Sequence, residues 1–429
     1  MAKTKKINKW KNGLLPVILM SFATGSVYCW TLFVDRILNH SDVFSPTILA
    51  WAFSLALFSL GISAALGGKL VENNIKMSSL LTFLFFTGGW LITGIGIQFE
   101  LPGLVLLGFG PIQGVGLGLG YLAPVKTLMM WFHENKGLAA GIAIAAFGLS
   151  GMFGNPLIEA FLQSGIIVYH AFYLLTLIYG IALLIAYLTM DRPTDTPDML
   201  TVGDDAGDDK VYSFKEIVFS RKFIFLWVVL FLNITCGLAI IGNERQIYLT
   251  LGFTDRIFGI NGDTIIVIFT SLNAFGNLIG RVICAAAQDK TNKKYFPYYI
   301  MTIVSIAICL LAIMLPFASG GYFILVLTVM TIFVIQFFFG AGFACLPNIL
   351  EQEYGMKQIA TIQGYMLTAW AVAGLVGNQI STFILGDFSN PSTINTLYVV
   401  LSILYFVQLV FLVLWVRNKI KKDKLAITT

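Results

Sequence analysis

The amino-acid sequence predicts an all-α membrane protein with twelve transmembrane helices arranged as two six-helix pseudo-repeats. Of the 429 residues, 57% are hydrophobic and only 11% are charged, and the mean hydropathy is +0.83. Apolar segments long enough to cross a bilayer recur along the chain with polar gaps between them, and polar landmarks of the first half return in the second. These observations place the chain among integral membrane proteins.

The apolar segments come near or exceed the roughly 18 residues that distinguish a membrane span from a core helix. Lipid offers no partner for exposed backbone N–H and C=O groups, so we expect spans of this length to be helices rather than strands. The expected cores are residues 13–34, 46–68, 78–97, 101–131, 137–163, 167–189, 223–243, 264–287, 297–317, 321–346, 358–385 and 393–416.

The lysine-rich N-terminus sets the expected orientation. The span that follows MAKTKKINKWK is too long for a cleaved signal peptide, so this segment is expected to stay on the cytoplasmic side. Of the 27 lysines and arginines, three then fall outside (Arg36, Arg245, Arg256) and two lie within spans (Lys126, Arg281), which leaves 22 in cytoplasmic segments. This bias predicts that both termini are cytoplasmic. It also accounts for the net charge of +5, so we expect no nucleic-acid partner.

The longest polar segment, from Asp191 to Lys222, divides the spans into two sets of six. We therefore predict an N-terminal half over residues 1–195, a cytoplasmic linker over 196–219 and a C-terminal half over 220–429. Offsets of 217 to 223 residues relate Gly118-Leu119-Gly120-Tyr121 to Gly340-Ala341-Gly342-Phe343, Gly154-Asn155 to Gly377-Asn378, and residues 68–76 to 285–293. Parallel six-helix repeats are typical of transporters that rock two halves around a midplane site.

Arg281 marks the expected binding site. It lies in the apolar stretch SLNAFGNLIGRVICAAAQ, about eight residues before the polar run that begins at Asp289, and no acidic residue lies between Thr264 and Gln288. At roughly 1.5 Å per helical residue, Arg281 is about 12 Å from the polar end of its helix, near mid-membrane. A charge there costs roughly 2.5 kcal/mol or more, so it normally faces a cavity or a partner. We expect Arg281 to bind an anion, with Asn277 beside it one helical turn earlier.

Lys126, in the predicted span four, leaves two interpretations open. Its stem can run toward the cytoplasmic interface so that the ammonium group meets water. Alternatively, it can reach the cavity at nearly the depth of Arg281. One guanidinium holds one carboxylate bidentately, so the first interpretation favours a monoanion, whereas the second restores two positive charges and makes dicarboxylates candidates.

Metal, cofactor and enzyme chemistry are not indicated by the sequence. All five cysteines fall inside predicted spans without CxxC spacing, and the three histidines lie far apart. Gly110, Gly114 and Gly118 recur every four residues in mid-span, which indicates close helix packing rather than a phosphate loop. We expect no metal, no cofactor and no catalytic site.

Several motifs occur in the order and spacing of one family of carriers. They are GSVYCWTLF at 25–33, Gly120-Tyr121 with Trp131-Phe132 and KGLA at 136–139, Asn277 with Gly280-Arg281 and Asp289-Lys290, and the eroded loop Gly68…Glu72…Lys76. Together they resemble the oxalate:formate antiporter family of the major facilitator superfamily, which also includes pyruvate and other monocarboxylate carriers. The resemblance covers essentially the whole chain. It implies the major facilitator fold, a monomer and a bacterial inner membrane.

The resemblance also implies roles for individual residues. The arginine in span eight that binds the substrate carboxylate falls on Arg281, and the family's cavity aromatics fall on Tyr28, Trp30 and Tyr121. Oxalate carriers of the family place a lysine in span eleven, where this chain has none, and Trp370 is the best candidate for that position. The charged residues of the loops after spans two and eight are expected to act in gating: Glu72, Lys76, Asp289 and Lys290.

We therefore expect a secondary transporter of small carboxylates of the pyruvate, lactate or formate class that works by alternating access. Its expected partners are a small organic anion and the lipid bilayer. A dicarboxylate antiporter that uses Arg281 and Lys126, and a transporter-like sensor that binds an anion, are alternatives. Only Glu159 comes close to being an acidic residue inside the membrane, so no dedicated proton relay is evident. An unpaired Arg281 predicts exchange, and cotransport with a proton stays open.

Overall fold

The computed structural model describes residues 8–193, 212–251, 259–291, 295–314, 321–355, 357–385 and 392–428. Within these residues, eleven helical segments are long and apolar enough to cross a membrane, and Phe296–Ala312 is a shorter apolar helix. Together they form the twelve predicted spans, so the expected all-α fold is confirmed. Residues 196–211 of the predicted linker lie outside the described residues, and the rest of it contains the short helix α10 (Phe214–Val218).

The spans are built from helices that follow one another along the chain. The first six spans contain α1 (Leu15–Gly25), α2 (Thr31–Leu38), α3 (Pro46–Asn73), α4 (Ile75–Gln98), α5 (Pro102–Leu107), α6 (Gln113–Trp131), α7 (Lys136–Leu149), α8 (Asn155–Gln163) and α9 (Val168–Thr189). The last six contain α11 (Arg221–Ile241), α12 (Glu244–Thr250), α13 (Gly262–Asp289), α14 (Phe296–Ala312), α15 (Gly321–Tyr354), α16 (Ile359–Met366), α17 (Thr368–Leu385) and α18 (Ser392–Thr428).

Helix breaks recur at equivalent positions of the two halves. A 3-10 segment, Ser26–Trp30, separates α1 from α2, and Gly242 and Asn243 separate α11 from α12. A π-helical segment that begins at Ser150 separates α7 from α8, and Leu367 separates α16 from α17. Ser26 and Asn243, like Ser150 and Leu367, are 217 residues apart, which is one of the offsets that the sequence landmarks show. Broken helices of this kind frame the binding sites of many transporters.

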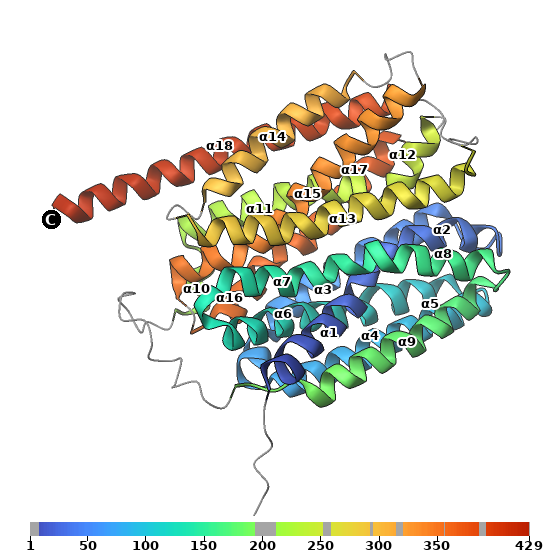
Figure 1. Ribbon diagram of the computed structural model, residues 1–429, viewed down its shortest axis with the longest axis horizontal. Coiled ribbons are helices and arrows are strands. Elements are labelled where there is room, and N and C mark those ends of the chain that lie inside the picture. The colour runs from blue at the N-terminus through green and yellow to red at the C-terminus, as the bar shows by residue number, and fades with distance from the viewer. Residues whose placement is uncertain are drawn as a thin grey trace, which may run out of the picture.

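The two sets of six spans lie side by side as two layers, with α7 and α13 running next to each other at the boundary (Figure 1). The helix α1 begins, and α9 and α18 end, at one end of the molecule, on the left in Figure 1. We call this the terminal end. The short helices α2, α8 and α12 lie at the opposite end.

Small residues let the two layers approach closely. A Cβ atom on Gly61 of α3 would lie 2.7 Å from the Cβ of Ala371 on α17. A Cβ on Gly141 of α7 would lie 2.7 Å from the Cβ of Ala285 on α13. Neither position has room for a side chain, so α3 and α7 contact the second layer through backbone.

The glycine series of span four packs in the same way within the first layer. A Cβ on Gly114 would lie 2.6 Å from the carbonyl oxygen of Ala56, and one on Gly118 would lie 2.3 Å from that of Leu60. Both partners are on α3. The prediction that this series serves helix packing is therefore confirmed.

Candidate functional site

Arg281 lies on α13 at the boundary between the layers and is fully buried. Its Nε donates a hydrogen bond to Asn277 Oδ1 at 2.8 Å, one helical turn earlier. Its Nη1 donates to the carbonyl oxygen of Ile144 on α7 at 2.5 Å. Nη2 is buried without a hydrogen-bond partner, and within the described residues no acidic side chain pairs with the guanidinium. Arg281 thus bridges the two layers and keeps the N–H groups of Nη2 for a further acceptor.

Two glycines of α7 bring its backbone within reach of this guanidinium. A Cβ on Gly141 would lie 3.2 Å from the carbonyl oxygen of Arg281, and one on Gly148 would lie 3.2 Å from Leu278 Cα. Ile144 lies between these glycines on the helix. Its carbonyl therefore faces α13 at the depth of Arg281.

Aromatic rings from both layers enclose the Arg281 guanidinium. Its Cζ lies 5.8 Å from the ring centre of Phe147 on α7 and 5.7 Å from that of Phe343 on α15. Tyr121 on α6 meets both rings edge-on, at centroid distances of 5.9 and 6.3 Å. Trp370 on α17 lies 4.3 Å from Phe343. The π-faces stabilise a cation in a site that holds no counter-charge from the described residues.

Three aromatic donors in this cluster are buried without a hydrogen-bond partner: Tyr28 Oη, Tyr121 Oη and Trp370 Nε1. Tyr28 comes from the break between α1 and α2 and lies 5.8 Å from Phe147. Both hydroxyls lie within electrostatic range of Arg281, and the Tyr28 hydroxyl is close enough to interact with its guanidinium directly. Leaving a buried donor unpaired costs roughly 1–3 kcal/mol, and a carboxylate offers only acceptors. The cluster is therefore chemically complementary to a small carboxylate.

Trp30 and Lys126, two further residues from the sequence prediction, lie away from this cluster. Trp30 Nε1 donates to the carbonyl oxygen of Leu49 at 3.1 Å, and its ring lies 3.8 Å from that of Phe109 inside the first layer. Lys126 Nζ pairs with Glu72 Oε2 at 2.9 Å. Because Glu72 is near the end of α3, this contact draws Lys126 toward the terminal end.

Two of the four residues expected to act in gating cross between the layers at the terminal end. Glu72 Oε1 accepts from the backbone N–H of Ala360 in the first turn of α16, at 2.8 Å. Asp289 Oδ2 accepts from the backbone N–H of Leu138 in the first turn of α7, also at 2.8 Å. Glu72 and Asp289 are 217 residues apart, so equivalent carboxylates cap helices of the opposite layer.

The other two residues expected to act in gating have no contact across the layers within the described residues. Lys76 pairs with Asp191 at 3.2 Å inside the first layer, and Lys290 is exposed. An ion pair that sequence reasoning missed, Lys136 with Glu351 at 2.9 Å, joins the layers instead. Lys136 belongs to the KGLA motif, but its partner 215 residues away carries no local signal in the sequence.

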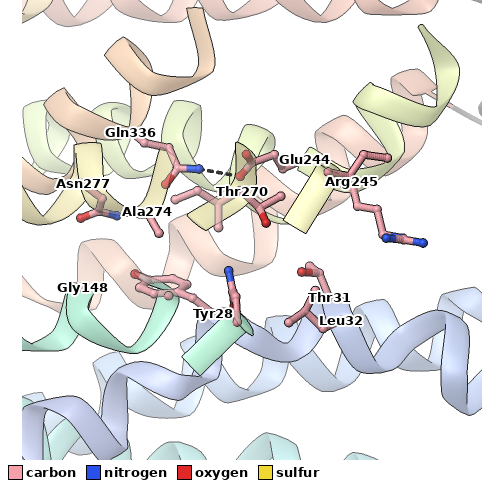
Figure 2. A pocket seen from close by; sticks show the side chains of 14 residues that line it. Tyr28, Thr31, Leu32, Gly148, Glu244, Arg245, Thr270, Ala274, Asn277 and Gln336 are labelled. Carbon is pink, nitrogen blue, oxygen red and sulfur yellow. Dashed lines mark hydrogen bonds between the residues drawn. The ribbon is translucent and has the colours of Figure 1, made fainter. Parts of the chain in front are cut away.

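A cavity of about 40 Å³ lies between the layers, next to Asn277 (Figure 2). Tyr28 lines it from the first layer, and Asn277, Glu244 and Gln336 line it from the second. Sequence reasoning missed Glu244, because it follows the core of span seven and reads as part of an outer loop. The helix break beside it became visible only in the structure, so no signal in the sequence marked this residue.

Within the described residues, fewer side-chain contacts join the layers at the opposite end. Arg245 Nε meets Asp35 Oδ2 of the first layer at 2.8 Å, and Arg245 Nη2 meets Asp263 Oδ1 of its own layer at 2.8 Å. Cavities of about 200 and 260 Å³ adjoin this group. Glu159 lines the larger one and lies 3.6 Å from Arg36. As far as the described residues show, the layers are therefore more open here than at the terminal end.

Two layers of six spans around a buried polar site define a multi-pass membrane transporter. The sequence model of the Major Facilitator Superfamily matches residues 12–378, and the chain belongs to this superfamily. It is a transporter and not an enzyme.

The chain is similar in sequence to two bacterial transporters and in fold to a human one. It is 25% identical over 407 residues to the oxalate:formate antiporter of Oxalobacter formigenes, an alignment that covers 93% of this chain and 90% of that protein. It is 24% identical over 370 residues to the uncharacterized transporter YhjX of Escherichia coli K12, covering 84% and 85%. The crystal structure of the human organic anion transporter MFSD10 shares the fold, with a TM-score of 0.62 at 11% identity over 93% and 98% of the two chains.

Proposed function

We propose that the chain carries a small monocarboxylate of the pyruvate, lactate or formate class by alternating access around Arg281. The observation that carries this proposal is the buried guanidinium with an unpartnered Nη2, beside three unpartnered aromatic donors. One carboxylate would satisfy these donors and neutralise the single positive charge. Residues 1–195 and 220–429 would move as the two halves.

The charge of the site favours a monoanion over a dianion. Arg281 is the cation of the cluster, whereas Lys126 is paired with Glu72 at 2.9 Å. A dicarboxylate that used both cations would have to break this pair. We therefore place the substrate carboxylate at Arg281 alone, with Tyr28, Tyr121 and Trp370 as donors around it.

The proposed cycle closes one end of the molecule at a time. Glu72 and Asp289, each bound to a backbone N–H of the opposite layer, would hold the terminal end shut and release it when the halves rock. The lysine and arginine bias of the sequence supports a cytoplasmic terminal end in a bacterial inner membrane. An anion that neutralises Arg281 lowers the cost of switching, and both exchange and cotransport with a proton meet this requirement.

The test is uptake of labelled pyruvate, lactate, formate and oxalate into proteoliposomes, with and without substrate inside. We compare the native protein with Arg281→Gln and Arg281→Lys, and use Arg221→Gln, an exposed arginine at the start of α11, as the matched control. Two charge-assisted hydrogen bonds are worth roughly 1.5–3 kcal/mol each. Arg281→Gln should therefore lose at least about 100-fold in uptake, and Arg281→Lys somewhat less.

The outcomes separate the alternatives. Saturable uptake of a monocarboxylate that is faster with substrate inside, and lost in Arg281→Gln but kept in Arg221→Gln, supports the proposal. Undiminished uptake by Arg281→Gln overturns the site. Preference for oxalate that disappears in Lys126→Gln would restore the dicarboxylate antiporter, and binding without uptake of any acid would favour a sensor.

A further inference from the structure

Glu244 is a buried carboxyl group without a counter-charge among the described residues. It is the first residue of α12, directly after the break in span seven, and only 5% of it is exposed. Asn273 Nδ2 donates to its Oε1 at 2.6 Å. Gln336 Nε2 donates to its Oε2, also at 2.6 Å (Figure 2). The neighbouring Arg245 points away from it, toward Asp35 and Asp263. Two neutral amides are therefore the partners that the structure gives this carboxylate.

Burial favours the neutral form of this group. An ionised carboxylate without a cation loses its hydration and gains little in return. The hydrogen bonds that Glu244 accepts from Asn273 and Gln336 act in the opposite direction, because they stabilise the ionised form. The titratable and charged groups around it are Tyr248, Tyr398, Tyr28 across the cavity, Arg245, and Arg281 through Asn277.

The amide groups around Glu244 suit either protonation state. Asn273 Nδ2 donates to Glu244 and to Tyr248 Oη, at 2.6 and 2.8 Å, while Asn273 Oδ1 is buried without a partner. An amide that turns by half a rotation exchanges its donor for its acceptor. After such a turn, Asn273 Oδ1 can accept from a protonated Glu244 and from the Tyr248 hydroxyl. The side chains around Glu244 can therefore accommodate a proton on its carboxyl group without a rearrangement of helices.

The cavity that Glu244 lines also reaches two residues of the Arg281 site. It has a volume of about 40 Å³, and its lining includes Tyr28 and Asn277, which accepts the hydrogen bond from Arg281. An anion that reached Arg281 through this cavity would pass the Glu244 carboxyl group. Ionised, the carboxyl would repel the anion and offset the charge of Arg281, and protonated, it would do neither.

We propose that Glu244 is the proton-binding site that couples carboxylate transport to a proton in this carrier. The inference rests on the proposed function of Arg281. The summed charge of Arg281, Glu244 and the anion explains the coupling. In the empty carrier, ionised Glu244 balances Arg281. In the loaded carrier, Glu244 is protonated and the bound monoanion balances Arg281. A proton alone or an anion alone leaves a net charge, which is costly to move through the membrane. The carrier should therefore cross empty or with both, as an electroneutral symporter.

The test uses proteoliposomes of the native protein, Glu244→Gln and Glu159→Gln. The last is the matched control, because Glu159 is a buried acid at the same end that pairs with Arg36 and does not line the cavity of Glu244. The first readout is labelled pyruvate counterflow at equal pH on both sides. The second is uphill accumulation driven by an inward proton gradient, which at one proton per anion gives about tenfold per pH unit.

We expect counterflow of the native protein and of Glu159→Gln to fall as the pH rises and Glu244 ionises. In Glu244→Gln the pH profile should be flat, and proton-driven accumulation should be lost. Accumulation that persists in Glu244→Gln, or that follows a sodium gradient instead of the pH, overturns the inference. Native protein that shows no counterflow of any monocarboxylate refutes the proposed function itself.

A measurement on the native protein alone covers the case in which Glu244→Gln does not fold. Pyruvate is added to purified protein in weakly buffered detergent solution, and the pH is followed with an indicator. At a pH at which most Glu244 is ionised, the protein should take up about one proton from solution per bound anion. The uptake should vanish at acidic pH, where the carboxyl is already protonated. Anion binding without proton uptake at any pH overturns the assignment of Glu244.

Discussion

Replacement of Gly137 by alanine should weaken the closure of the terminal end. Gly137 is the second residue of α7, and a Cβ there would lie 2.1 Å from Asp289 Oδ1 and 2.6 Å from Asn348 Nδ2. Both partners belong to the other layer, on α13 and α15. The Asp289 carboxylate would have to move and give up the hydrogen bond that it accepts from Leu138 N–H at 2.8 Å.

The free-energy cost of Gly137→Ala follows from the contacts that the added methyl group displaces. A hydrogen bond to a charged group is worth roughly 1.5–3 kcal/mol, and overpacking typically costs about 1–3 kcal/mol. We take a destabilisation of the closed state by about 2 kcal/mol. When the halves separate at this end, Gly137 and Asp289 no longer meet, so the penalty applies to the closed state alone. The open population should therefore rise about 30-fold.

The assay is the reaction of a cysteine at Thr361 with an impermeant maleimide. Thr361 is buried between the layers, where a Cβ on Gly68 would lie 2.7 Å from its Cα. The control is Gly88→Ala on α4, where a Cβ would meet nothing within 4 Å. Labelling should be about 30-fold faster with Gly137→Ala and unchanged with Gly88→Ala. Equal rates in the two variants, after subtraction of the protein without the cysteine at 361, would refute the reasoning.

Three further predictions concern the site and the opposite end. Trp370→Phe removes an unpartnered N–H and should raise the KM for monocarboxylate uptake about tenfold. Trp30→Phe is the control and should lower the Tm without changing the KM. A KM of Trp370→Phe equal to that of the native protein would exclude Trp370 from the site. Asp35→Asn breaks an ion pair across the layers worth up to about 1 kcal/mol, so a cysteine at Thr31 should react up to about fivefold faster, and slower reaction would contradict this. Asn277→Asp places a carboxylate beside the guanidinium and should weaken anion binding about 10- to 100-fold in calorimetry; tighter binding would argue against a charge-based site.

The fold was predictable because its determinants are local or repeat along the chain. Span length and hydropathy act on each segment alone, and the duplicated landmarks needed only a comparison of the two halves. The helix breaks were not predicted. Gly242-Asn243 lacks the proline that marks many kinks, and its equivalence to Ser26–Trp30 becomes visible only when both breaks are seen in the structure.

The candidate site was predictable where a residue type is unusual for its surroundings. Arg281 stands out in an apolar helix, whereas Glu244 does not stand out at the polar edge of one. Trp30 is two residues from Tyr28, and in a 3-10 segment of about three residues per turn they point to different sides. The motif GSVYCWTLF contains both residues, so it could not show that Tyr28 lies in the site and Trp30 does not. The pairing of Lys126 with Glu72 depends on how α6 packs against α3, which a single sequence does not encode locally.

The contacts at the two ends differ in kind, and this difference has a consequence for the proposed cycle. Glu72 and Asp289 each place a carboxylate at the first turn of a helix in the other layer, a contact worth roughly 0.3–1 kcal/mol and up to about 2 kcal/mol when partly buried. Separation at the terminal end breaks both. Separation at the opposite end breaks the pair of Arg245 with Asp35, but Asp263 of its own layer still holds the guanidinium. Opening the opposite end therefore costs less, so the empty carrier should rest closed at the terminal end, and binding of the anion must supply the free energy that reverses this preference.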